Sequence, residues 1–368
     1  RDLFRLKGQA GAISLVMALG VMLLVMMDGL VNTLEESRRA YYLEYRLADV
    51  FAPVVRMPER HLSRLGELPQ ITAIEGRIVG DALLSLSSQV LPIRAQVVSL
   101  PDFERPRLND ILLRHGRMPS PEKANEVVLL NSFAKARHLT VGDSFTATLY
   151  GKQRTFDIVG LAQSPEFLYT TAPGELIPAE GRFAVFWMTQ SALAAAFDMD
   201  GAYNQVLVSV SPGVKLTAVI NRVDDLLKDY GALGAYDLSE QASNRFISEE
   251  ISGLRASSRA VPPIFLGVAA FLLYIVMGRL IQAEREQIGL LKAFGYTSVE
   301  VSGHYFKLVL VIATLGAAAG SGLGVMAGHS MASFYQAFFK FPVILFQLDA
   351  RVFVLGLLVS VIAASLGG

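Results

Sequence analysis

The chain has 368 residues, of which 52% are hydrophobic and 18% charged, and its mean hydropathy is +0.42. This composition is too apolar for a soluble protein and too polar for one made of membrane spans alone, so it predicts a membrane protein with one large aqueous domain. The 33 basic and 33 acidic residues cancel, which gives no indication of nucleic acid as a partner. Because cysteine is absent, disulfides, thiolate metal sites and cysteine nucleophiles are excluded.

The first expected membrane span covers residues 8–30. Its apolar core is close to the roughly twenty residues that cross a bilayer, and no small-x-small cleavage site follows it. An uncleaved anchor is therefore favoured over a signal peptide. Arg1, Arg5 and Lys7 precede the span and place the N-terminus in the cytoplasm. Since the chain starts with Arg and ends within an apolar run, we expect it to be a piece of a longer protein.

Residues 31–258 are predicted to form an extracytoplasmic domain, with helical stalks over 34–47 and 239–258 that continue the adjoining spans. Two matched helical stalks suggest that movement of the spans is transmitted mechanically to the domain. Strand, helix and strand patterns follow each other twice. The first set is at 49–56, 58–68 and 71–86, where 71–86 is one long strand or two short ones, and the second is at 204–211, 214–230 and 232–237. Two such units around an insertion predict a split, ferredoxin-like α+β layer.

The insertion, about 92–200, is predicted to be rich in β-structure. Its expected strands are 126–130, 144–150, 154–161 and 182–188, with a turn at Gly151-Lys152 between two of them. A long loop with apolar and acidic residues contains Glu166 to Tyr169 and Pro173 to Pro178. A surface loop is favoured there over a site for a substrate or a periplasmic partner.

Three more spans are expected at 260–281, 305–332 and 351–368, the last of them truncated. The connection between the first two of these carries Arg279, Arg285, Lys292 and Lys307, which assigns it to the cytoplasm by the excess of positive charge. This agrees with a cytoplasmic N-terminus. The fold class is therefore an α-helical membrane protein with four spans in this chain and a large α+β domain between the first and second spans.

The third span carries a stripe of glycines, Gly316, Gly320, Gly324 and Gly328, one every four residues. Such a stripe lies on one face of a helix and lets another backbone approach closely, which predicts helix packing within the chain or against a second copy of it. Gly322-Leu-Gly324-Val-Met-Ala327 formally matches a loose dinucleotide-binding pattern, but no strand precedes it, so packing is the better explanation. His329 is interpreted as a polar residue near the outer interface in preference to part of a relay.

The search for catalytic patterns returns nothing. The sequence has no phosphate-binding loop, no His-Glu-x-x-His and no Gly-x-Ser-x-Gly, and its five histidines show no metal-ligand spacing. We therefore expect no enzyme activity, no metal and no cofactor in this chain. An intramembrane enzyme is disfavoured because the spans carry no polar residue other than His329 at their middle.

The segment 284–298 is predicted to be a short amphipathic helix at the membrane face, ended by Gly295 in a left-handed conformation. Its string Glu286-x-x-Gly289-Leu290-Leu291-Lys292-Ala293-Phe294-Gly295, followed by a span that opens with His304-Tyr305-Phe306-Lys307, resembles the cytoplasmic coupling helix of FtsX/MacB-like ABC transporter permeases. That family includes the lipoprotein-releasing permeases. Val141-Gly142-Asp143, with the following hairpin and Ile158-Val159-Gly160, resembles the family's periplasmic core pattern, so the resemblance covers nearly the whole chain.

The resemblance implies a non-catalytic permease of the bacterial inner membrane that couples ATP hydrolysis by a partner ABC ATPase to a periplasmic conformational change. It would act by mechanical transmission, for export or extraction of an amphiphilic substrate. The residues expected to couple to the ATPase are Glu286, Ile288, Gly289, Leu291, Lys292, Phe294 and Gly295. The other implied partners are a second permease copy or homologous half and a periplasmic protein.

Two alternatives stay open at this stage. A transmembrane sensor with a periplasmic ligand-binding domain is disfavoured because receptors of that plan place a signalling helix or a kinase after the second span, where this chain has a short loop and more spans. Regulation of a cell-wall hydrolase is compatible with the same family resemblance. The transported substrate is not indicated by any motif.

Overall fold

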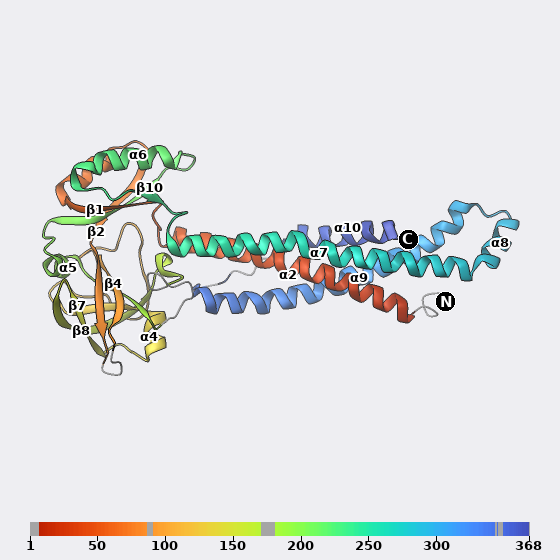
Figure 1. Ribbon diagram of the computed structural model, residues 1–368, viewed down its shortest axis with the longest axis horizontal. Coiled ribbons are helices and arrows are strands. Elements are labelled where there is room, and N and C mark those ends of the chain that lie inside the picture. The colour runs from red at the N-terminus through yellow and green to blue at the C-terminus, as the bar shows by residue number, and fades with distance from the viewer. Residues whose placement is uncertain (1–6, 87–90, 171–180, 343, 345–348, 368) are drawn as a thin grey trace. The chain divides into compact units, whose positions relative to one another are not determined.

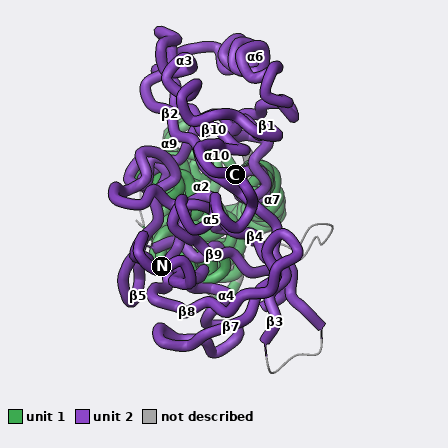
Figure 2. The backbone as a smooth tube through the Cα atoms, turned by 90° about the vertical axis from the view of Figure 1, so that its left-hand side faces the viewer, with its two compact units in different colours: residues 1–38, 249–338, 343–368 green, residues 39–248, 339–342 purple. Residues whose placement is uncertain are grey.

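The structure is a computed structural model, and it describes residues 7–86, 91–170, 181–342, 344 and 349–367. The chain divides into two compact units, which Figure 2 colours differently. We call residues 1–38, 249–338 and 343–368 the helical unit, and residues 39–248 and 339–342 the sheet unit. Each is described by itself.

The helical unit is built from long apolar helices. Its elements are α2 (Lys7–Glu44), α7 (Ala242–Ala283), α8 (Arg285–Ala293), α9 (Ser298–Phe339) and α10 (Ala350–Gly367) (Figure 1). In the described part of the chain three of them, α2, α7 and α9, are long and apolar enough to cross a membrane. The described apolar stretch of α10, Ala350–Ser365, is shorter, so its role as a fourth span stays a prediction.

Both predicted stalks are helical. α2 continues past its apolar part to Glu44, and α7 begins at Ala242, well before the apolar run that starts at Ala260. Each stalk therefore shares one uninterrupted helix with its span. The interior of the helical unit is apolar, with Met17, Val21, Ala269, Leu273 and Ala313 among its buried side chains.

The described residues of the sheet unit form two sheets. One has four strands in the order β11-β1-β10-β2, and every neighbouring pair is antiparallel. The strands are β1 (Val50–Pro58), β2 (Ile71–Arg77), β10 (Ala202–Val210) and β11 (Tyr236–Asp237). Helix α3 (Leu62–Gly66) connects β1 to β2, and α6 (Leu216–Leu227) connects β10 to β11. Helix α6 turns Val219, Val223 and Leu227 into the core. Both strand-helix-strand units that the hydrophobic pattern predicted are present.

The other sheet has seven strands in the order β5-β8-β6-β9-β4-β3-β7. They are β3 (Val79–Ser85), β4 (Ile93–Leu100), β5 (Leu112–Gly116), β6 (Glu126–Leu130), β7 (Ser144–Leu149), β8 (Lys152–Gln163) and β9 (Phe183–Thr189). The N-terminal half of β8 pairs with β7, and its C-terminal half pairs with β6. Six of the strands therefore close on themselves as a barrel, with β5 attached to the end of β8.

The barrel is filled by large apolar side chains. Trp187, Phe156 and Phe186 are fully buried in it, together with Phe133 of α4 (Asn131–Arg137). A further short helix, α5 (Gln190–Phe197), follows β9. The predicted strands 126–130, 144–150, 154–161 and 182–188 correspond to β6, β7, β8 and β9. The barrel also uses β3, which precedes the expected start of the insertion at residue 92.

Candidate functional site

Helix α8 is a short helix with a defined end. The N–H of Tyr296 donates to the carbonyl of Leu291 at 3.2 Å, and the N–H of Gly295 donates to the carbonyl of Lys292 at 3.1 Å. Gly295 has a φ of +98°, the left-handed conformation that its position predicted. These are the two bonds of a Schellman motif, which satisfies the last carbonyls of a helix. Phe294 is thereby held at the end of α8.

The next helix, α9, is capped at its start. The N–H of Thr297 donates to Oε2 of Glu300 at 2.8 Å, and the N–H of Glu300 donates to Oγ1 of Thr297 at 3.3 Å. This reciprocal pair is a capping box, and its Thr-x-x-Glu signature is present in the sequence but was missed there. In addition, the Tyr305 hydroxyl donates to Oε2 of Glu284 at 2.7 Å, which joins α9 to the residue before α8. The connection between α7 and α9 is therefore built from capped helices.

Helix α8 and the residues after it expose large apolar side chains. Leu290, Leu291 and Phe294 are 62%, 40% and 76% exposed, and none of the described residues of α8 is buried. Tyr296 and Val299 are exposed beside them in the sequence. We call Leu290, Leu291, Phe294, Tyr296 and Val299 the α8 patch. Exposed apolar side chains gathered in one segment mark interaction sites.

The other predicted coupling residues lie on the same short helix. Glu286, Gly289 and Lys292 are exposed, and Ile288 is half-buried. Sequence reasoning named Leu291 and Phe294 but missed Leu290, Tyr296 and Val299. Leu290 stands in the helix beside Leu291, while Tyr296 and Val299 follow the helix end, where a helical periodicity no longer applies.

Three glycines of the stripe in α9, Gly316, Gly320 and Gly324, face α2. Gly316, Gly320, Gly324 and Gly328 are all buried. A Cβ atom built on Gly320 would lie 2.5 Å from the carbonyl oxygen of Ala18, and one built on Gly324 would lie 2.9 Å from that of Met22. Gly322, which is off the stripe, has nothing within 4 Å of such an atom. The two backbones approach so closely that these positions admit no larger residue.

This geometry gives a first prediction. Replacing Gly320 with leucine is expected to lower the thermal stability of the purified protein in detergent, because the new side chain would collide with the α2 backbone, which cannot rotate away. Overpacking of this kind typically costs about 1–3 kcal/mol. Gly322→Leu, on the open side of the same helix, is the matched control and should leave the melting temperature close to that of the wild type. Equal melting temperatures for the two variants would contradict the packing.

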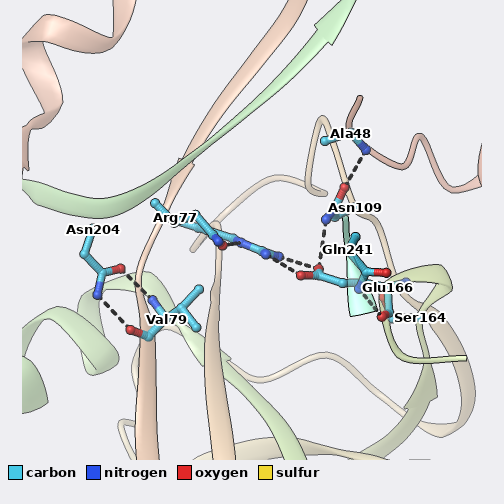
Figure 3. Close-up of polar contacts among 9 residues, drawn as sticks. Ala48, Arg77, Val79, Asn109, Ser164, Glu166, Asn204 and Gln241 are labelled. Atoms are coloured by element: carbon cyan, nitrogen blue, oxygen red, sulfur yellow. Dashed lines mark hydrogen bonds and ion pairs between the residues drawn. The ribbon is translucent and has the colours of Figure 1, made fainter. Parts of the chain in front are cut away.

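A second cluster of polar contacts lies inside the sheet unit (Figure 3). Arg77, the last residue of β2, makes two hydrogen bonds to Glu166, from Nη1 to Oε2 at 2.8 Å and from Nη2 to Oε1 at 2.6 Å. Their side chains are only 6% and 10% exposed. The Nε of Arg77 donates to Gln205 of β10 at 2.7 Å. A planar guanidinium that meets a carboxylate through two parallel bonds is the strongest geometry for such a pair.

Glu166 also connects the chain segments next to the two stalks. Asn109 donates to Oε2 of Glu166 at 2.8 Å and accepts from the N–H of Ala48, which follows α2. Gln241, the residue before α7, donates to the backbone carbonyl of Glu166 at 2.8 Å. We call Ala48, Arg77, Asn109, Glu166 and Gln241 the polar junction. It ties a strand of the four-stranded sheet, the segment after β8 and both stalk ends together.

The electrostatics of the polar junction are those of a charged pair. Burial by itself lowers the pKa of an arginine, but the attraction and hydrogen bonds of Glu166 outweigh it and raise the pKa of Arg77 above its ordinary value. Burial raises the pKa of the neighbouring Glu75 carboxyl, although this carboxyl accepts the N–H of Leu108 at 2.6 Å. The guanidinium therefore stays charged.

The prediction of a surface loop at Glu166 to Tyr169 is wrong for Glu166 and Leu168, which are both buried. Glu166 and Leu168 are 8% and 3% exposed, because the segment turns inward to meet Arg77. Tyr169 stacks on Phe246 of α7, with ring centroids 3.6 Å apart. The second part of the predicted loop, Pro173 to Pro178, lies outside the described residues.

The order of these elements defines a class of protein. A long apolar helix, a large α/β unit, a second long helix, a short exposed helix and a third long helix follow one another, as in a multi-pass membrane protein with its large domain between the first two spans. Comparison with known families agrees. A model described as MacB-like periplasmic core domain matches residues 12–226, and one described as FtsX-like permease C-terminal matches residues 260–368.

The chain belongs to the family of FtsX-like permeases with a MacB-like periplasmic core domain. The resemblance drawn from the sequence is thus confirmed, and with it the role of an ABC transporter permease in a membrane with a periplasmic domain.

Solved structures give remote similarities. The periplasmic region of MacB from Actinobacillus actinomycetemcomitans is 11% identical, with a TM-score of 0.35 over 57% of this chain and 95% of that one. The extracellular domain of the noncanonic ABC-type transporter YknZ from Gram-positive bacteria is 9% identical, with a TM-score of 0.32 over 52% of this chain and 98% of that one. A search of curated proteins gives no match.

Proposed function

We propose that this chain is the non-catalytic permease of an ABC transporter of the bacterial inner membrane, driven by a separate ATPase that binds α8. The observation that carries the proposal is the α8 patch, which presents exposed apolar side chains on a helix capped at its end. Phe294 and Leu291 lie three residues apart, on neighbouring parts of one helical face, so both can enter a groove of the ATPase. Glu286 and Lys292 flank this face with charge.

Movement of α8 would reach the sheet unit through α7. That helix runs without interruption from Ala242, next to Gln241 of the polar junction, to Ala283, two residues before α8 begins. A continuous helix shared by two sites can carry a displacement from one to the other, although Pro262 and Pro263 remove two of the hydrogen bonds of α7. We infer a mechanical relay in which ATPase closure moves α8 and α7 and thereby the polar junction, for extraction or export of an amphiphilic substrate.

We also infer that the four-stranded sheet is a split ferredoxin-like layer. Its order β11-β1-β10-β2 places each β-α-β unit around a strand of the other, which is the arrangement of that fold. The barrel is then an insertion between the two β-α-β units. We expect it to be the part of the sheet unit that contacts a periplasmic protein. A second permease copy or a homologous half would complete the transporter.

Membrane orientation tests the proposal directly, since the chain has no cysteine and each introduced thiol is a unique reporter. A cysteine at Lys152, exposed at the start of β8, is expected to react with a membrane-impermeant thiol reagent in intact spheroplasts. A cysteine at Gln287, exposed on α8, should react only after lysis. The opposite pattern would place α8 where no ATPase can reach it.

A further inference from the structure

The helical unit contains a cavity of about 480 Å³ lined by α2, α7 and α10. Its size falls in the range of sites for small molecules and lipid headgroups. None of its lining residues belongs to the α8 patch or to the polar junction.

The lining is divided into a polar end and an apolar end. Its polar residues are Asp28, Asn32, Ser258, Arg259, Asp349 and Arg351, and its apolar residues include Leu24, Leu266, Leu355 and Val359. In each of the three helices the sequence changes from polar to apolar at one position. Asp28 follows the apolar run of α2, Arg259 precedes that of α7, and Arg351 precedes that of α10. The cavity therefore lies where three helices, α2, α7 and α10, change from polar to apolar sequence.

The charges at the polar end balance. The lining contains two arginines, Arg259 and Arg351, and two carboxylates, Asp28 and Asp349, and Asn32 donates to Asp28 at 3.3 Å. A ligand with one negative and one positive group fits such a set better than an anion or a cation alone, because each group then meets charge of the opposite sign.

Two backbone carbonyls of α7 beside the polar end lack their ordinary helical donors. Pro262 and Pro263 lie inside α7, and a proline has no N–H to donate to the carbonyl four residues earlier. The carbonyls of Ser258 and Arg259 therefore lack their ordinary helical donors, and both residues line the cavity. An ammonium group with three N–H bonds can donate to such carbonyls, whereas a trimethylammonium group has none to donate.

We propose that this cavity binds a zwitterionic phospholipid with a primary ammonium group, of the phosphatidylethanolamine type. The phosphate pairs with Arg259 and Arg351, and the ammonium pairs with Asp28 and Asp349 and donates to the freed carbonyls of α7. The acyl chains leave along Leu355 and Val359, whose surroundings are apolar. This inference deepens the proposed function, on which it rests, because it needs the helical unit to lie in a bilayer.

The test is native mass spectrometry of the full-length permease, purified, stripped of lipid and mixed with equal amounts of phosphatidylethanolamine, phosphatidylcholine and phosphatidylglycerol. The wild type is expected to retain phosphatidylethanolamine preferentially. Arg259→Ala should reduce that retention roughly tenfold, as expected for one lost charged hydrogen bond. Arg279→Ala removes the same charge from an exposed site at the other end of α7 and is the matched control.

A second pair of variants keeps the test independent of folding. Because Leu355 is 52% exposed, Leu355→Trp should not disturb a packed core. The larger side chain would fill the apolar end without removing a charge, and it should also displace the lipid. Leu358→Trp, at a position 55% exposed and outside the cavity, should not. Equal retention of the three lipids, or equal behaviour of Leu355→Trp and Leu358→Trp, would overturn the site. ATPase copurification with the same wild-type preparation shows separately whether the permease assignment holds.

Discussion

Replacing Phe294 with alanine is expected to weaken binding of the partner ATPase by roughly thirtyfold and to abolish most of its stimulated ATP turnover. Phe294 is 76% exposed at the capped end of α8, so its removal deletes an interface side chain without opening a core. Truncating a buried aromatic anchor of an interface typically costs about 2 kcal/mol or more, which corresponds to that loss of affinity. Copurification and ATPase assays of the reconstituted complex measure both effects.

The control is Phe103→Ala, which removes an aromatic side chain that is 90% exposed in the sheet unit and should change neither quantity. Gly295→Val provides an independent perturbation of the same site. Because Gly295 has a φ of +98°, valine there strains the helix end and should weaken ATPase binding while membrane insertion is kept. Full binding and stimulation by Phe294→Ala would show that α8 does not couple, and a sensor with a periplasmic binding domain would gain support.

Replacing Arg77 with methionine is expected to destabilise the sheet unit by about 3–5 kcal/mol, because it leaves the buried carboxylate of Glu166 without its counter-charge. For a unit of this size such a loss lowers the melting temperature by on the order of 10 °C. The loss of stability is measured by heating the purified full-length protein and using proteolysis of the sheet unit as the signal of its unfolding. Arg114→Met, which removes an exposed hydrogen bond to Gln163, is the matched control and should shift stability by less than about 0.5 kcal/mol.

The double variant Arg77→Met with Glu166→Leu separates the charge from the packing. If an unpaired carboxylate is the cause, the double variant should be more stable than Arg77→Met alone, since both charges are then absent. A double variant that is less stable than the single one would mean that Arg77 acts through its contacts with Gln205 and its neighbours, and not through its ion pair.

Local patterns were sufficient for elements whose burial alternates or repeats. β6, β7, β8 and β9 carry regular apolar runs, and the stalks keep a helical spacing into their spans. β5 was missed because it is five residues long and mostly exposed, and β4 because its C-terminal half, Val97 to Leu100, is buried on both faces, which ends the alternation of a half-buried strand.

Long-range pairing could not be predicted in the same way. Arg77 and Glu166 are separated by 89 residues. Because charged residues are mostly exposed, each of them is predicted to lie at the surface unless its partner is known. The glycine stripe shows the same limit, since its period identifies the face of α9 but not the backbone that packs on it. For α8 the helix and its end at Gly295 were predictable, because they depend on few distant contacts, while three of the five residues of the α8 patch were not named.

The closed barrel has a consequence for how the protein tolerates crowding. Sheet edges expose unpaired N–H and carbonyl groups that recruit strands from other molecules, and aggregation often starts there. Among the described strands, the six that close the barrel satisfy one another, and the strand added outside it, β5, is only five residues long. The protein can therefore be present at high density in a membrane with little strand pairing between the barrels of neighbouring copies.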